Sequence, residues 1–100
     1  MRVEFHPEAE RELIEAAVYY EHQVPGLGQR LGTEVWRSID LLLENPNIGS
    51  LFGSDLRQWG LNRFPFRLIY AALPERIWIV ALAHEKRRPG YWRSRAVRRS

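Results

Sequence analysis

The residues most able to do chemistry in this sequence are the arginines of its second half. Three fall within predicted strands: Arg57, Arg63 and Arg67. Further cations follow the last predicted strand: Lys86, Arg87, Arg88, Arg93 and Arg95. A planar guanidinium group binds phosphate through two parallel hydrogen bonds. Because short turns return strand ends to one side of a sheet, the pattern predicts a concave basic surface that binds a polyanion such as nucleic acid.

The charge is divided unevenly along the chain. Residues 1–50 carry four arginines against nine acidic residues, a charge of −5, whereas residues 51–100 carry ten arginines and one lysine against three acidic residues, a charge of +8. A high genomic GC content also favours arginine over lysine, but it does not separate the charge into two halves. We therefore expect an acidic partner for the second half.

Two side chains in this basic region can transfer protons. His84 ends the last predicted strand, and histidine is the residue type that most often serves as a general acid or base. Tyr91 follows in the tail. If an RNA backbone is the substrate, His84 or Tyr91 is the expected general acid or base. The alternative for His84 is a hydrogen bond to the backbone at the strand end.

Aromatic rings lie among the same arginines. Tyr91 and Trp92 offer faces on which unpaired bases stack. The alternative is that Trp92 packs the tail back onto the sheet. Glu85 either acts as a base or pairs with an arginine, and we favour the pair. His6 and His22 lie in the acidic half, where we expect structural roles.

Metal-dependent catalysis is not expected. Only three acidic residues follow residue 50, Asp55, Glu75 and Glu85, too few for a two-metal nuclease. The chain has no cysteine, and its three histidines are scattered, which argues against zinc. Any RNA cleavage would proceed through attack by the neighbouring 2′-OH, with arginines stabilising the charge that develops at phosphorus. We expect no metal and no other cofactor.

Composition indicates one globular domain over residues 1–100. Hydrophobic residues make up 45% of the chain and charged residues 27%. The longest apolar run, Ile77 to Ala83, is far shorter than the roughly 20 residues of a membrane span. Charges near the N-terminus argue against a signal peptide. We expect a cytoplasmic protein.

The hydrophobic pattern predicts two helices after a short strand at residues 2–6. Pro7 suits a first helical turn, and an apolar stripe at three- and four-residue intervals extends to about His22. Pro25-Gly26 ends that pattern, and a second amphipathic helix runs from about Leu27 to Asn45-Pro46. The two helices are expected to form an antiparallel hairpin.

After a loop at residues 46–55, the apolar pattern changes to the period of strands. Residues 57–63 and 64–70 alternate, and Ile77 to Ala83 is apolar at every position, which is typical of a central strand. The order predicts an α+β fold in which the hairpin packs on one face of a mainly antiparallel sheet, in the order β-α-α-β-β-β. A short basic tail follows, and residues 96–100 are expected to fray.

Together these features resemble the RelE/ParE superfamily of toxins from bacterial type II toxin–antitoxin pairs, often called plasmid-stabilisation proteins. The resemblance covers nearly the whole chain, and its fold is the one predicted above. The segments that carry it are Phe5-His6-Pro7, Tyr19-Tyr20-Glu21, Gly26-Leu27-Gly28, Asn45-Pro46, the run from Arg63 to Tyr70, and the run from His84 to Trp92.

The resemblance implies one of two activities. RelE-like members enter the ribosome and cleave mRNA without metal, and the residues that match their nuclease set are Arg67, His84, Arg87 and Tyr91. ParE-like members inhibit DNA gyrase without catalysis, and the long helical hairpin of this chain is like theirs. Our first hypothesis is the ribosome-dependent mRNA endonuclease, which binds ribosome and mRNA.

Two alternatives stay open beside this hypothesis. One is the gyrase inhibitor, acting through the hairpin and tail, and the other is an inactive relative or a plain nucleic-acid-binding module. Under either toxin reading, the expected partner is an acidic, partly disordered antitoxin encoded nearby, wrapped around the basic sheet and the helices.

Overall fold

The computed structural model describes residues 1–97. A strand, two helices, four strands and a short helix follow one another. Their bounds are β1 Arg2–Phe5, α1 Pro7–Gln23, α2 Leu27–Glu44, β2 Ser50–Phe52, β3 Leu56–Gly60, β4 Phe66–Ala72, β5 Arg76–His84 and α3 Arg93–Val97. The predicted α+β class is confirmed. None of the helices within residues 1–97 is long and apolar enough to cross a membrane.

The strands form one sheet in the order β1-β5-β4-β3-β2. β1 runs parallel to β5, and the other neighbours are antiparallel. β5 lies between β1 and β4, as its uninterrupted apolar run predicts. The meander has four strands rather than three, because β2 forms inside the segment 46–55 that was predicted as a loop.

The helical hairpin has the predicted limits, and specific contacts close its turn. The Glu21 carboxylate accepts hydrogen bonds from the backbone N–H groups of Gly26 (2.6 Å) and Gly28 (3.0 Å). The bond from Gly26 is the main reason that the pKa of Glu21 is lowered. A Cβ atom at Gly28 would lie 2.1 Å from the carbonyl oxygen of Ala17. Glycine at this position therefore allows the two helices to touch.

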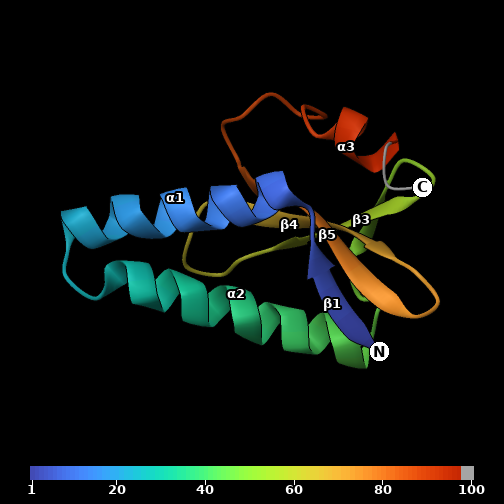
Figure 1. The fold of residues 1–100 in the computed structure, drawn as a ribbon, viewed down its shortest axis with the longest axis horizontal. Coiled ribbons are helices and arrows are strands. Elements are labelled where there is room, and N and C mark those ends of the chain that lie inside the picture. Colours follow the sequence, from blue (N-terminus) through green and yellow to red (C-terminus); the bar gives the residue numbers. More distant parts are fainter. Residues whose placement is uncertain (98–100) are drawn as a thin grey trace.

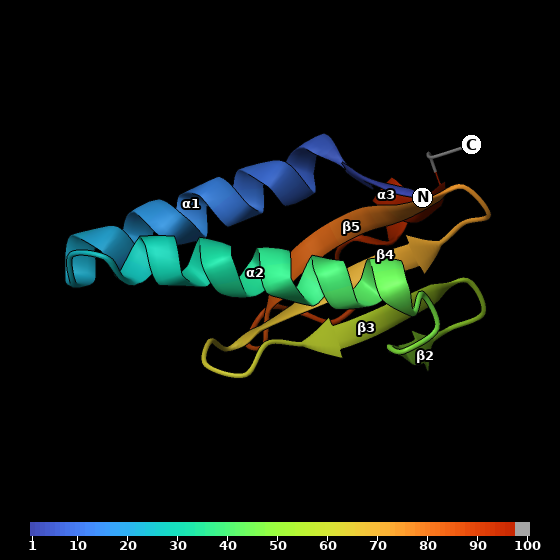
Figure 2. The ribbon, with the colours of Figure 1, turned by 90° about the horizontal axis from the view of Figure 1, so that it is seen from below.

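The hairpin covers one face of the sheet, which we call the helix face (Figures 1 and 2). Side chains from both helices and from alternate strand positions form the larger core there. Its most deeply buried members include Ala9, Leu31, Val35, Ile39, Leu42, Leu68, Tyr70, Ile77 and Ile79.

The opposite face of the sheet is covered by residues 85–97, which we call the tail. Trp92 is 5% exposed and belongs to a second core cluster with residues of β3, β4 and β5. Its ring lies 5.4 Å from that of Phe52, and α3 lies behind the sheet in Figure 2, away from α2. The tail thus folds back onto the sheet, which confirms the packing alternative for Trp92. Of the segment expected to fray, residues 98–100 lie outside the described residues.

Candidate functional site

The residues matched to a nuclease set are distributed over both faces of the sheet. His84 is paired with Phe66, and their rings meet edge to face at 5.0 Å on the helix face. Arg67 follows Phe66 in β4, so its side chain points to the tail side. There its Nη1 donates to Oε1 of Gln58 at 2.9 Å. The structure does not bring Arg67 and His84 together.

His84 also has the backbone contact considered as its alternative role. Its Nδ1 accepts a hydrogen bond of 3.0 Å from the backbone N–H of Lys86. The side chain is partly buried against Phe66. These contacts explain the position of His84 without a substrate.

Tyr91 is held by Glu12 of α1. Its hydroxyl donates to Oε2 of Glu12 at 2.7 Å. Burial, followed by this hydrogen bond to a carboxylate, raises the pKa of Tyr91. The guanidinium carbon of Arg87 lies 4.0 Å from the centre of the phenol ring. Tyr91 therefore retains its proton and has one face covered, which favours a structural role over proton transfer.

Arg95 completes this contact and is not available to a polyanion. Its two Nη atoms donate to the two oxygens of Glu12 at 3.0 and 2.9 Å. Nη1 also donates to the carbonyl oxygen of Val80 at 3.1 Å, while Glu12 accepts from the N–H of Leu82 at 3.0 Å. Glu12 and Arg95 thus provide hydrogen-bond partners for Val80 and Leu82 on the edge of β5 that β1 does not reach.

Arg57 has a structural role on the helix face. Its Nη1 donates to the carbonyl oxygens of Asn47 (3.1 Å) and Gly49 (2.7 Å). It is paired in register with Tyr70, whose hydroxyl accepts from the N–H of Gly49 and donates to the carbonyl oxygen of Pro46. Arg57 therefore fixes the segment before β2 and does not share a face with Arg67.

The remaining cations belong to β4 and to the tail, and we call this set the tail cations. All are exposed: Arg67, Lys86, Arg87, Arg88 and Arg93. The guanidinium carbon of Arg93 lies 5.4 Å from the centre of the Phe52 ring. Glu85 is also exposed, and the pair expected between it and an arginine is not formed within residues 1–97.

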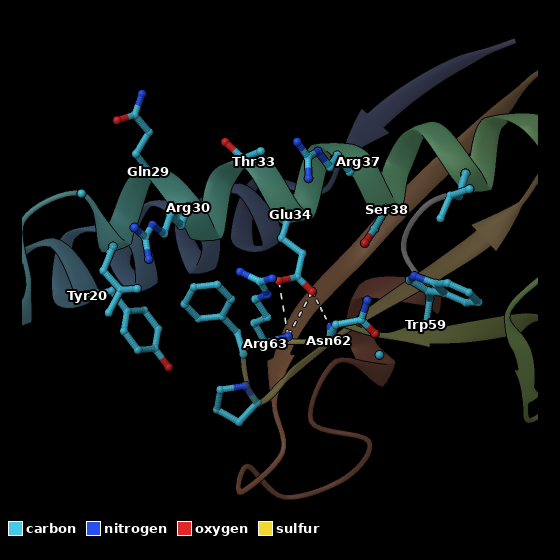
Figure 3. A pocket seen from close by; sticks show the side chains of 16 residues that line it. Tyr20, Gln29, Arg30, Thr33, Glu34, Arg37, Ser38, Trp59, Asn62 and Arg63 are labelled. Atoms are coloured by element: carbon cyan, nitrogen blue, oxygen red, sulfur yellow. Dashed lines mark hydrogen bonds between the residues drawn. The ribbon is translucent and has the colours of Figure 1, made fainter.

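Arg63 lies in a different place, a groove of about 1180 Å³ between α2 and the loop that joins β3 to β4. Figure 3 shows Glu34 reaching across the groove from α2, where it accepts hydrogen bonds from the backbone N–H groups of Asn62 and Arg63. Arg30 and Arg37 of α2 line the same groove. None of these three arginines forms an ion pair with a carboxylate among the described residues.

Sequence reasoning missed most of this groove and the role of Glu12. Arg30 and Arg37 lie in the acidic half, and Trp59 belongs to an alternating strand pattern, so none of them stood out. Glu12 lies off the apolar stripe of α1 and therefore looked like a solvated residue. No sequence signal indicated the groove, because Glu34 lies four positions after Arg30 and three before Arg37, so both arginines have an acidic residue at helical spacing.

Comparison with known proteins places the fold and the family. Residues 3–89 match the family described as the ParE toxin of type II toxin-antitoxin system, parDE. A solved chain described as the chromosomal ParDE TA system from P. aeruginosa is similar with a TM-score of 0.72. The two chains are 18% identical over 84% of this chain and 95% of that chain, so this likeness concerns the fold alone. A comparison with curated proteins finds no match.

Proposed function

Because the chain belongs to the ParE toxin family of type II toxin–antitoxin systems, we propose that it inhibits DNA gyrase by binding and does not cleave mRNA. The match covers most of the chain, and it favours the gyrase alternative over our first hypothesis. RelE-like and ParE-like members share the fold, so the choice between them depends on the arrangement of individual side chains.

The observation that carries the proposal is the separation of the nuclease candidates. General acid–base catalysis needs the proton donor and acceptor within hydrogen-bond reach of the same reacting group. Arg67 and His84 lie on opposite faces of the sheet. Tyr91 donates its proton to Glu12 and has a raised pKa. This arrangement supports a toxin that acts through its surface.

The hairpin offers a surface suited to binding another protein. Ile14 and Val18, four residues apart on α1, are 57% and 50% exposed. Trp36 of α2 is 48% exposed. These residues lie off the buried stripe of each helix, where polar residues are usual. Exposed apolar residues on both helices of the hairpin support a docking site, and we assign gyrase to it.

The groove suits the second partner of such a toxin, an acidic antitoxin encoded nearby. Glu34 accepts hydrogen bonds from backbone N–H groups and forms no ion pair with Arg30, Arg37 or Arg63. A segment that carries carboxylates would pair with these arginines and cover apolar groove residues such as Trp59. We propose that the antitoxin occupies the groove.

Two assays on the purified toxin test the gyrase proposal. In the first, gyrase supercoils a relaxed plasmid at increasing toxin concentration. In the second, mRNA on translating ribosomes is probed for cleavage by primer extension. We expect inhibition of supercoiling and intact mRNA, with the same results for His84→Gln as for the wild type. Cleavage of mRNA that His84→Gln abolishes would overturn the proposal and restore the endonuclease hypothesis.

A further inference from the structure

The tail cations differ from four other arginines within residues 1–97 in what holds them. Arg2, Arg11, Arg76 and Arg95 each form an ion pair with a glutamate. The tail cations form no such pair within residues 1–97. Their positive charge is therefore not neutralised by a neighbouring carboxylate in the described part of the chain.

Three of these arginines are nevertheless held in place by neutral groups. Arg67 donates to the amide oxygen of Gln58, Arg87 stacks on Tyr91, and Arg93 lies over the ring of Phe52. A guanidinium group stacked on a ring keeps its N–H edge free for two parallel hydrogen bonds to an anion. Because each side chain is already oriented, less conformational entropy is lost when an anion binds.

The positions of these residues place them on one surface. Arg67 is paired with Ala83 near the end of β5, and the N–H of Glu85 donates to the carbonyl oxygen of Pro65, which joins the start of the tail to the start of β4. From there the tail crosses the sheet to Phe52 of β2, where Arg93 lies. The tail cations thus follow one path across the face that the hairpin leaves open.

The aromatic residues of the tail help to identify the kind of anion. Proteins that bind single-stranded nucleic acid stack its bases on exposed aromatic rings. Here Trp92 is buried in the second core cluster, and the guanidinium groups of Arg87 and Arg95 both lie over the Tyr91 ring. Cations without an exposed stacking platform suit the evenly spaced phosphates of a duplex.

We propose that the tail cations bind the phosphate backbone of duplex DNA. This site goes beyond the proposed inhibition of gyrase, since it is on the other side of the sheet from the hairpin. If both proposals hold, the toxin contacts gyrase with its helices and the DNA that gyrase holds with its tail.

The test is fluorescence anisotropy of a labelled DNA duplex with the purified toxin over a series of salt concentrations. Substituting three arginines, Arg67→Gln, Arg87→Gln and Arg93→Gln, should weaken duplex binding by at least about tenfold. It should also make the slope of log affinity against log salt shallower by about 2 to 3. The matched control removes three carboxylate-paired arginines through Arg2→Gln, Arg11→Gln and Arg76→Gln, with an expected change within about twofold.

Several outcomes would overturn the proposal. The first is that the wild type does not bind the duplex, and the second is that both triple substitutions weaken duplex binding equally. The third is that single-stranded DNA binds more tightly than the duplex. The fourth is that polyglutamate displaces the labelled duplex as well as unlabelled duplex does. The last result would identify an acidic protein as the partner. Circular dichroism checks folding, and if the first variant does not fold, Lys86→Gln with Arg88→Gln replaces it with the same expected direction. The assay contains no gyrase, so its failure is distinguishable from failure of the proposed function.

Discussion

Glu12 and Arg95, 83 residues apart in sequence, form a forked ion pair at the point where β5 loses its neighbour β1. Each side chain is 14% exposed. The carboxylate accepts from the N–H of Leu82, and the guanidinium group donates to the carbonyl oxygen of Val80. The two side chains therefore make the hydrogen bonds that a neighbouring strand would make to β5 at this point, and they join α1 to the tail.

Glu12→Ala should destabilise the protein substantially. The substitution leaves the Arg95 charge, the Tyr91 hydroxyl and the Leu82 N–H without their acceptor. Loss of one member of an ion pair that is largely buried costs up to about 3 kcal/mol. Urea unfolding of the two proteins measures the difference. Glu15→Ala, on an exposed position of the same helix, is the control and should change the free energy of unfolding by less than about 0.5 kcal/mol. Equal effects of both substitutions would contradict this role of Glu12.

The Tyr91 hydroxyl should make stability depend on alkaline pH. Burial and the bond to Glu12 raise its pKa in the folded state above the ordinary value of 10.0. The stabilisation that the protonated Tyr91 hydroxyl gives to the folded state is fully present below pH 10.0. As the pH rises further, the unfolded chain loses this proton first, and folding becomes less favourable. Unfolding midpoints between about pH 8 and about pH 11 should therefore fall more steeply for the wild type than for Tyr91→Phe. Parallel curves would show that Tyr91 is not coupled to folding in this way.

Two glycines of α2 should respond in opposite directions to the same substitution. Gly28→Ala places a methyl group 2.1 Å from the carbonyl oxygen of Ala17 and forces the helices apart, at a cost of about 1 to 3 kcal/mol. At Gly32 nothing lies within 4 Å of an added Cβ. Gly32→Ala should therefore stabilise the protein by about 0.5 to 1 kcal/mol through helix propensity. Thermal unfolding of both variants checks the contact, and stabilisation by Gly28→Ala would disprove it.

Ile14→Ser with Val18→Ser should separate function from folding. The two side chains are 57% and 50% exposed, so the free energy of unfolding should change by less than about 1 kcal/mol. If gyrase docks on the hairpin, the concentration of toxin needed to inhibit supercoiling should rise by at least about tenfold. The control, Ile48→Ser with Leu51→Ser, removes two exposed aliphatic residues near β2. Unchanged inhibition by the α1 variant would place the gyrase contact elsewhere.

Much of the fold was predictable because local signals agree with the packing. Pro7, Pro25-Gly26 and Asn45-Pro46 limit the helices, and the apolar run of β5 indicates an interior strand. The strand β2 was missed since three residues among glycine, serine and asparagine carry little strand signal. It depends on pairing with β3.

The candidate site was predictable in its charge and not in its geometry. The sequence places Arg57, Arg63, Arg67 and Arg95 in one basic half, but in the structure their side chains lie in four different surroundings. These are the carbonyl oxygen of Gly49 for Arg57, the groove for Arg63, Gln58 for Arg67 and Glu12 for Arg95. The contact between Glu12 and Arg95 spans nearly the whole chain, so no local pattern indicates it. The tail cations are the part of the predicted basic surface that remains together.

Pulse labelling after induced expression tests the central claim most directly, following DNA synthesis and protein synthesis separately during the first minutes. Inhibition of gyrase predicts that DNA synthesis stops first while translation continues, and that His84→Gln behaves like the wild type. The Ile14→Ser and Val18→Ser variant should not stop DNA synthesis. An early stop in translation that His84→Gln abolishes, with DNA synthesis continuing, would contradict the account.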